Sequence, residues 1–197
     1  MIQIINTGVA NIRSLQAAFD RIGQPWNLTE DPALIREATH VVLPGVGAYA
    51  AAAAAIDSLG LRETIIERLN DGGTSTLCIC LGMQLLGSSS EESPGAKGLG
   101  VIDAQITRFS DEVQVPQLGW NNVVPNPSCS QTVYPAGEAY FANSFRLLSP
   151  PEGWDFATTD YDGQFVSSIW RGKTLACQFH PELSGDWGQQ LLKDWAK

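Results

Sequence analysis

The feature that most constrains the fold is a regular alternation of short apolar runs and helical patterns in residues 1–86. Apolar runs that predict strands lie at residues 1–5, 26–28, 41–43 and 75–79. Helices are predicted from Ile12 to Ile22, after the start signal Asp31-Pro32, from Ile56 to Leu69 and from Leu81 to Leu86, and Ala48–Ala55 is a further strong helix former. Because parallel strands need crossover connections, this order predicts an α/β fold with a mostly parallel central sheet flanked by helices on both faces.

The second half of the chain is predicted to be β-rich. From Gly98 onward, Pro, Gly and Asn separate short strand-like segments at residues 101–109, 113–115, 140–148, 156–159, 165–170 and 174–179. Only residues 185–196 have a helical pattern. Neither a change of composition nor a repeat indicates a linker, so we expect residues 1–197 to form a single domain.

The composition argues against several classes of function. The 197 residues carry a formal net charge of -9, whereas binding to nucleic acid or to an anionic membrane requires a basic face. We recognise no signal peptide and no apolar run near the roughly 20 residues of a membrane span, so we expect a cytoplasmic protein. Four cysteines are too few for a disulfide scaffold, and Cys129 is expected to be an exposed loop thiol. With no metal cluster, Walker loop or dinucleotide motif, no cofactor or metal is predicted.

Cys80 is the candidate nucleophile. It lies where the apolar strand 75–79 is predicted to meet a helix, and Gly82 follows two positions later, as in the sharp turns on which hydrolases place a nucleophile. The positive end of the helix favours a thiolate, and backbone N–H groups after the turn can hold an oxyanion. The alternative is that Cys80 is a small buried apolar residue, as we expect for Cys78 and Cys177, and position alone does not decide between the two.

His180 and Glu182 are the candidates for the base and for the group that orients it. The chain has two histidines, and His40 precedes its strand at the amino end, whereas ligands gather at the carboxyl ends of parallel strands. His180 follows the strand 174–179, and its two-residue spacing from Glu182 would point both side chains the same way in an extended segment. A surface histidine with a helix-capping carboxylate is the alternative. Combined with Cys80, the pair meets the requirements of a Cys-His-Glu nucleophilic system.

These residues lie within longer motifs that resemble class I glutamine amidotransferases. The resemblance spans nearly the whole chain, and it is closest to the glutaminase subunits of imidazole glycerol phosphate synthases of histidine biosynthesis. The motifs are Asn6–Ser14, Leu43–Ala48, Ile79–Leu86 with Ser90–Glu92, Val115–Asn121, Tyr140–Ser144 and Gln178–Glu182. The cysteine and His-Pro-Glu segments are typical of the whole class, whereas Pro-Gly-Val-Gly and Gly-Trp-Asn indicate the histidine-pathway members.

The resemblance implies a flavodoxin-like amidotransferase fold and a role for each motif. The triad that releases ammonia from glutamine would be Cys80, His180 and Glu182. The oxyanion hole would be formed by Gly45, Val46, Gly47 and the Leu81 N–H. Residues that bind the glutamine would be Gln84, Asn143 and Ser144.

The resemblance also implies a partner. This would be a (β/α)8-barrel cyclase subunit, which uses the ammonia to make imidazole glycerol phosphate and an aminoimidazole carboxamide ribotide. The interface of this heterodimer would include Asn11, Arg13, Tyr140 and Leu183.

Three positions depart from the common pattern of the family. Gln117 and Asn143 stand where many members have histidine, and Leu183 stands where a basic residue lies at the subunit interface. None of the three removes a triad member, but Leu183 cannot form a cross-subunit ion pair. Three alternatives stay open: a class I amidotransferase for another acceptor, as in surface-sugar biosynthesis, a catalytically silent binding protein, and a cysteine hydrolase of peptides or esters.

Overall fold

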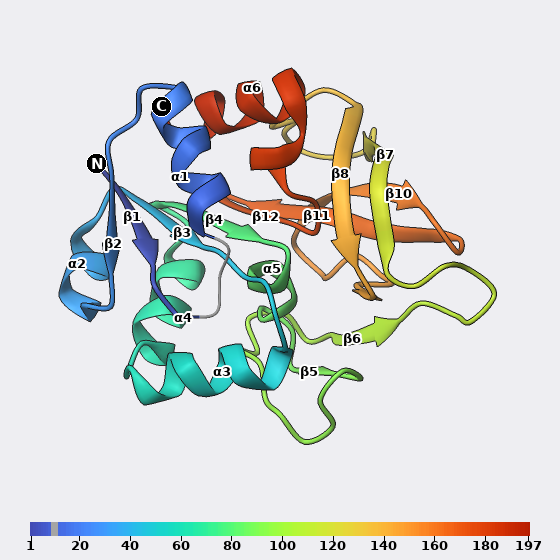
Figure 1. The fold of residues 1–197 in the computed structure, drawn as a ribbon, viewed down its shortest axis with the longest axis horizontal. Helices are drawn as coiled ribbons and strands as arrows, with labels where there is room; N and C mark the ends of the chain where they lie inside the picture. Colours follow the sequence, from blue (N-terminus) through green and yellow to red (C-terminus); the bar gives the residue numbers. More distant parts are fainter. Residues whose placement is uncertain (9–11) are drawn as a thin grey trace.

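The computed structural model describes residues 1–8 and 12–197, and its centre is a nine-stranded sheet (Figure 1). The strand order is β2-β1-β3-β4-β12-β11-β10-β7-β8. Five neighbouring strands run parallel: β2 (Trp26–Thr29), β1 (Ile2–Ile5), β3 (His40–Leu43), β4 (Ser75–Ile79) and β12 (Thr174–Cys177). The sheet continues with antiparallel strands: β11 (Gln164–Arg171), β10 (Asp155–Asp160), β7 (Gln117–Pro125) and β8 (Gly137–Asn143). The predicted α/β class is confirmed, and the sheet is parallel in one half and antiparallel in the other.

Helices cover both faces of the parallel strands. On one face lie α1 (Ile12–Arg21) and α6 (Gly185–Trp195), and on the other lie α2 (Pro32–Glu37), α3 (Tyr49–Ser58) and α4 (Arg62–Asp71) (Figure 1). Each face has its own apolar core, because successive residues of a strand point to opposite sides. Ile4 therefore packs in the core that contains α1, and Ile5 packs in the core that contains α3.

The remaining elements are short. A second sheet pairs β5 (Ser89–Ser90), β6 (Gln105–Arg108) and β9 (Phe145–Arg146). The α-helix α5 (Leu81–Gln84) follows β4, and the 3-10 helix η1 (Pro181–Leu183) precedes α6. None of the helices in the described ranges combines the length and the apolar character needed to cross a bilayer.

The helical predictions hold with one correction. Asp31 begins α2 as an N-cap, since its side chain accepts a 2.8 Å hydrogen bond from the Ala33 N–H. The stretch from Ile56 to Leu69, however, is not one helix but the end of α3 and most of α4. The chain turns at Gly60, whose φ of 66° lies in the left-handed region that favours glycine.

The strand predictions for the second half are less accurate. Residues 113–115 form no strand, the segment 101–109 contains only β6, and the segment 140–148 is divided at Ser144 between β8 and β9. The strand β7 was not predicted. Its burial pattern explains why, since its apolar residues Leu118 and Trp120 are 60% and 56% exposed while the polar Gln117 is buried.

The parallel arrangement brings three chain segments to one edge of the sheet. Leu43 of β3 pairs with Cys78 of β4, and Ile79 of β4 pairs with Cys177 of β12. The residues that directly follow these strands therefore leave the sheet at a common level. The loop after β3, the turn at Cys80 and the segment 178–182 meet there, at the carboxyl ends of the strands.

Candidate active site

Cys80 occupies a sharp turn between β4 and α5. Its backbone adopts φ 52° and ψ -108°, a conformation that residues other than glycine rarely adopt. The Cys80 N–H donates to the Cys177 carbonyl at 2.7 Å, which fixes the turn against β12. A side chain at Gly82 would collide with the carbonyl oxygen of Leu43, so a glycine is required two positions after the cysteine. The expected strand–turn–helix context is present, although α5 is only four residues long.

His180 and Glu182 form a direct pair beside this turn. His180 Nδ1 lies 2.8 Å from Glu182 Oε1, and both side chains are buried. The two-residue spacing brings the groups together, but not through an extended segment as predicted, because Glu182 lies in η1. The other ring nitrogen is left for Cys80, which is among the groups that raise the pKa of His180.

The electrostatics of the site favour a protonated imidazole. Burial by itself lowers the pKa of His180, but hydrogen bonds to Cys80 and Glu182 and the negative charges of both groups outweigh burial and raise the pKa to about 10. The imidazole is therefore a proton donor at neutral pH, held between the sulfur and the carboxylate.

The other thiols and the other histidine lie in different environments. Burial raises the pKa of Cys78 to about 12 and that of Cys177 well above its ordinary value, which suits the expected apolar role of both. Cys129 is half-buried, not exposed as expected, because its sulfur contacts the backbone N–H and carbonyl of Phe156 at 3.4 Å. His40 is the first residue of β3, at the amino end of the sheet. The structure thus places His180, and not His40, at the edge of the sheet that carries Cys80.

The loop 44–47 packs directly against the turn of Cys80. A Cβ atom on Gly45 would lie 2.6 Å from the Leu81 Cβ atom and from the Gly82 backbone nitrogen, so only a glycine allows this approach. Gly47 has a φ of 99°, in the region that favours glycine, and Val46 between them is half-buried. As the first residue of α5, Leu81 has an N–H without an intrahelical acceptor. The loop and this N–H lie next to each other.

Two of the three predicted glutamine-binding residues, Gln84 and Asn143, are connected to Cys80 through hydrogen bonds of the protein. Gln84 donates through Nε2 to the Phe145 carbonyl at 3.1 Å and to Gln178 Oε1 at 2.9 Å. Asn143 donates to the same Phe145 carbonyl at 3.0 Å. Ser144 is half-buried, and its carbonyl accepts from the Phe109 N–H. The structure thus brings Gln84 and Asn143 together through one carbonyl.

Three of the four predicted interface residues lie in the part of the chain that the structure describes. Tyr140 is half-buried on β8, Leu183 is exposed in η1 and Arg13 is exposed on α1, whereas Asn11 lies outside the described residues. The His180 N–H donates to the Tyr140 carbonyl at 2.9 Å, and the Tyr140 N–H donates to Ser184 Oγ at 2.9 Å. The backbone of β8 is therefore bonded to the segment that carries His180.

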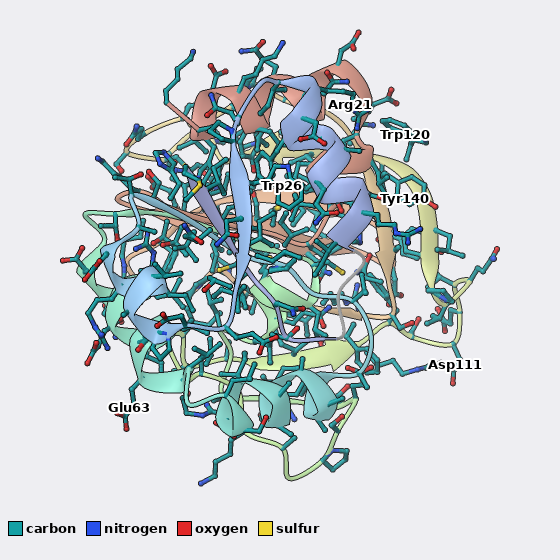
Figure 2. All side chains as sticks on the ribbon, turned by 60° about the vertical axis from the view of Figure 1, so that its left-hand side comes forward. Arg21, Trp26, Glu63, Asp111, Trp120 and Tyr140 are labelled. Atoms are coloured by element: carbon teal, nitrogen blue, oxygen red, sulfur yellow. The ribbon has the colours of Figure 1, made fainter. Side chains whose placement is uncertain are left out.

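Trp120 extends this surface. Its ring meets the Tyr140 ring edge-on with centroids 6.3 Å apart, and Figure 2 shows the two side chains next to each other at the molecular edge. A groove of about 560 Å³ runs between α1 and η1, lined in part by Arg21, Trp120, Glu182 and Leu183. An exposed apolar surface thus reaches the carboxylate that orients His180.

Three contacts at the site were not anticipated, although their residues belong to the quoted motifs. Gln178 donates through Nε2 to Cys80 Sγ at 3.5 Å, and Glu92 accepts from the Tyr49 N–H at the start of α3, directly after the loop 44–47. The third is the contact between the rings of Trp120 and Tyr140. The available signals were the position of Gln178 two residues before His180 and the solvent-facing position of Trp120 on an alternating strand.

No other chemical centre competes with this one in the described residues. A cavity of about 610 Å³ lies at the opposite edge of the sheet, lined in part by His40, Lys173 and Trp195. It is the larger hollow, but it lies at the amino ends of the strands and away from Cys80. Within residues 1–8 and 12–197, no group of three or more His, Cys, Asp or Glu side chains has the arrangement of a metal site.

Comparisons with known proteins identify the family of the chain. A family model described as glutamine amidotransferase class-I matches residues 4–197. The chain is 39% identical to the imidazole glycerol phosphate synthase subunit HisH of Moorella thermoacetica, over 100% of this chain and 94% of that protein. It is 38% identical to the subunit of the same name of Chlorobium luteolum, over the full length of both. A crystal structure of a glutamine amidotransferase, 18% identical, has the same fold, with a TM-score of 0.77 over 100% of this chain and 99% of that one. The chain therefore belongs to the class I glutamine amidotransferase family.

Proposed function

We propose that this chain is the glutaminase subunit of an imidazole glycerol phosphate synthase, built as a single amidotransferase domain over residues 1–197. The observation that carries this proposal is the imidazole of His180 held between the sulfur of Cys80 and the carboxylate of Glu182. The names of the curated relatives supply the reaction to which the ammonia would be delivered.

The first half-reaction would form a thioester. The Cys80 thiolate attacks the carboxamide carbon of glutamine, and the negative charge that develops on the oxygen is held by N–H groups of Leu81 and of the loop 44–47. His180, protonated because its pKa is raised to about 10, gives its proton to the departing nitrogen, so that ammonia leaves.

The second half-reaction would hydrolyse the thioester. Acylation removes the negative charge from the sulfur, and with it one of the causes that raise the pKa of His180. The neutral imidazole then takes a proton from water, the resulting hydroxide attacks the thioester carbon, and glutamate leaves as the thiol is restored. Glu182 orients the ring in both steps.

The partner would be a (β/α)8-barrel cyclase subunit, docked over the groove between α1 and η1. Two features support this position: the solvent-facing Trp120 and Leu118, and the neighbouring carboxyl edge of the sheet from which ammonia must leave. Direct transfer avoids protonation of the ammonia in bulk water. Because Cys80 is only 7% exposed beneath the loop 44–47, we expect slow turnover by the isolated chain.

The test is the release of glutamate from glutamine by the purified chain, with and without a cyclase subunit and its ribotide substrate. We expect a low rate for the chain alone, a strong increase with the loaded cyclase, and no activity in the Cys80→Ala variant. Full turnover by the isolated chain, unchanged by the cyclase, would contradict the coupled role. Stimulation by a different synthase would indicate another acceptor.

A further inference from the structure

A chain of buried carboxamides ends on the sulfur of Cys80. Asn143 and Gln84 both donate to the Phe145 carbonyl, Gln84 also donates to Gln178 Oε1, and Gln178 donates to Cys80 Sγ at 3.5 Å. Gln178 is only 1% exposed, so its amide cannot exchange these partners for water. Both of its hydrogen bonds connect groups of the site.

The chemistry of these groups fixes which end of each amide faces the sulfur. The Phe145 carbonyl can only accept, so Gln84 must present its NH₂ group there. The second hydrogen of the same NH₂ group points at Gln178, which must answer with its oxygen. The NH₂ group of Gln178 is then left for Cys80. The orientation follows from an acceptor that cannot reverse its role.

We propose that Gln178 is a positioning residue for Cys80. The amide N–H of Gln178 is directed at the sulfur, where it holds the Cys80 side chain in one rotamer and favours the negatively charged form of the sulfur. This inference rests on the proposed function, since it assigns the sulfur as the nucleophile. Gln84 and the Phe145 carbonyl act behind Gln178 by preventing rotation of its amide.

The placement of Gln178 gives the segment after β12 a threefold role. At two-residue intervals, Gln178 donates to the sulfur of Cys80, His180 carries the imidazole whose pKa the sulfur helps to raise, and Glu182 holds that imidazole. An amide has no titrating proton near neutral pH, so Gln178 donates to the sulfur whether His180 is protonated or neutral.

The test measures the reaction of Cys80 with iodoacetamide as a function of pH, resolved to this cysteine by peptide mass spectrometry. The variants are Gln178→Met, which lacks the donor, and the isosteric Gln178→Glu, which replaces it with a carboxylate. We expect the midpoint of the pH profile to rise by about one unit in Gln178→Met and further in Gln178→Glu. The rate at neutral pH should fall about tenfold or more.

The profile separates positioning from a general structural defect. At high pH, where the thiol is ionised in every variant, the rates should converge with that of the parent chain, whereas a disturbed fold would expose Cys80 and change the rate at all pH values. Gln164→Met, at an exposed position of β11, is the matched control and should leave the profile unchanged. Unfolded Gln178→Met is recognised by circular dichroism, and Gln178→Glu then decides alone.

A folded variant with the parent midpoint would overturn the role of Gln178. That outcome would leave the proposed glutaminase function untouched, since glutamine turnover is measured separately. Conversely, a shifted midpoint in a chain that does not hydrolyse glutamine would uphold the positioning role and contradict the proposed function.

Discussion

The two histidines lie at opposite edges of the parallel part of the sheet, and the charges around them have opposite signs. At the carboxyl edge, His180 faces a sulfur and a carboxylate, which raise its pKa to about 10. At the amino edge, burial lowers the pKa of His40, and the positive charges of the N-terminus, Arg68 and Lys173 lower it further. One edge therefore carries the proposed site of proton transfer, whereas the polar groups of the other edge stabilise the fold. Substitutions at each edge test this division.

The largest effect is expected at the nucleophile. Cys80→Ala removes the attacking sulfur, and glutamate release in the presence of the cyclase should fall at least about 10⁴-fold. Cys129→Ala, in a loop remote from the site, is the control and should retain activity. Substantial turnover by Cys80→Ala would show that the chemistry of this chain lies elsewhere.

Removing the charge of Glu182 should have the next largest effect. Glu182→Gln keeps the shape of the side chain but weakens its hold on the imidazole, so the rate should fall about 10² to 10⁴-fold. The pKa of His180 should also fall, as measured by NMR of the ring. Glu138→Gln, exposed on β8, is the control. If the pKa of His180 fell but the rate of glutamate release did not change, the ion pair between His180 and Glu182 would not be needed for catalysis.

At the amino edge the largest expected effect is on stability. The buried guanidinium of Arg68 donates to Thr76 and to the carbonyls of Ile35, Ala38, Thr39 and Ser75. Arg68→Met removes these five hydrogen bonds from a buried region, so the free energy of unfolding should fall by about 3 kcal/mol. The exposed Arg36→Met is the control, with an expected change below about 1 kcal/mol.

Denaturant titration measures both Arg68→Met and its control. Folded Arg68→Met should keep its glutaminase rate. A loss of activity without a loss of stability would contradict the division between the two edges.

The smallest effect is the pH dependence that each histidine adds. Since the folded pKa of His180 lies above 6.5, its stabilisation is complete below about pH 6.5 and is lost as the pH rises toward about 10. His40 acts in the opposite direction, and its burial costs stability as the pH falls below 6.5. NMR should show two ring titrations on either side of 6.5, and Cys80→Ala should lower only that of His180. Coincident titrations would remove the contrast.

The sequence predicted what local patterns determine. The parallel strands, the turn at Cys80 and the choice of His180 over His40 follow from apolar periodicity and from the edge at which each residue leaves its strand. The break at Gly60 was missed because apolar residues continue across it. The strand β7 was missed because most of its apolar side chains, Leu118, Trp120 and Val124, face outward, whereas Gln117 is buried.

The hydrogen bonds among the side-chain amides could not be predicted from the sequence, for a different reason. Gln84 and Gln178 are 94 positions apart, and nothing in either local sequence indicates which acceptor their amides meet. Glu182 reached His180 as expected, but through a turn of η1, since Pro181 begins a helix as readily as it holds an extended segment.

The backbone bonds between Tyr140, His180 and Ser184 have a mechanical consequence. A partner that contacts the rings of Trp120 and Tyr140 would contact β8 at Tyr140. The backbone of Tyr140 is hydrogen-bonded to His180 and to Ser184. A displacement of this strand would therefore reach His180 directly, without passing through the apolar core. The contact surface and His180 are separated by a single pair of hydrogen-bonded backbone segments.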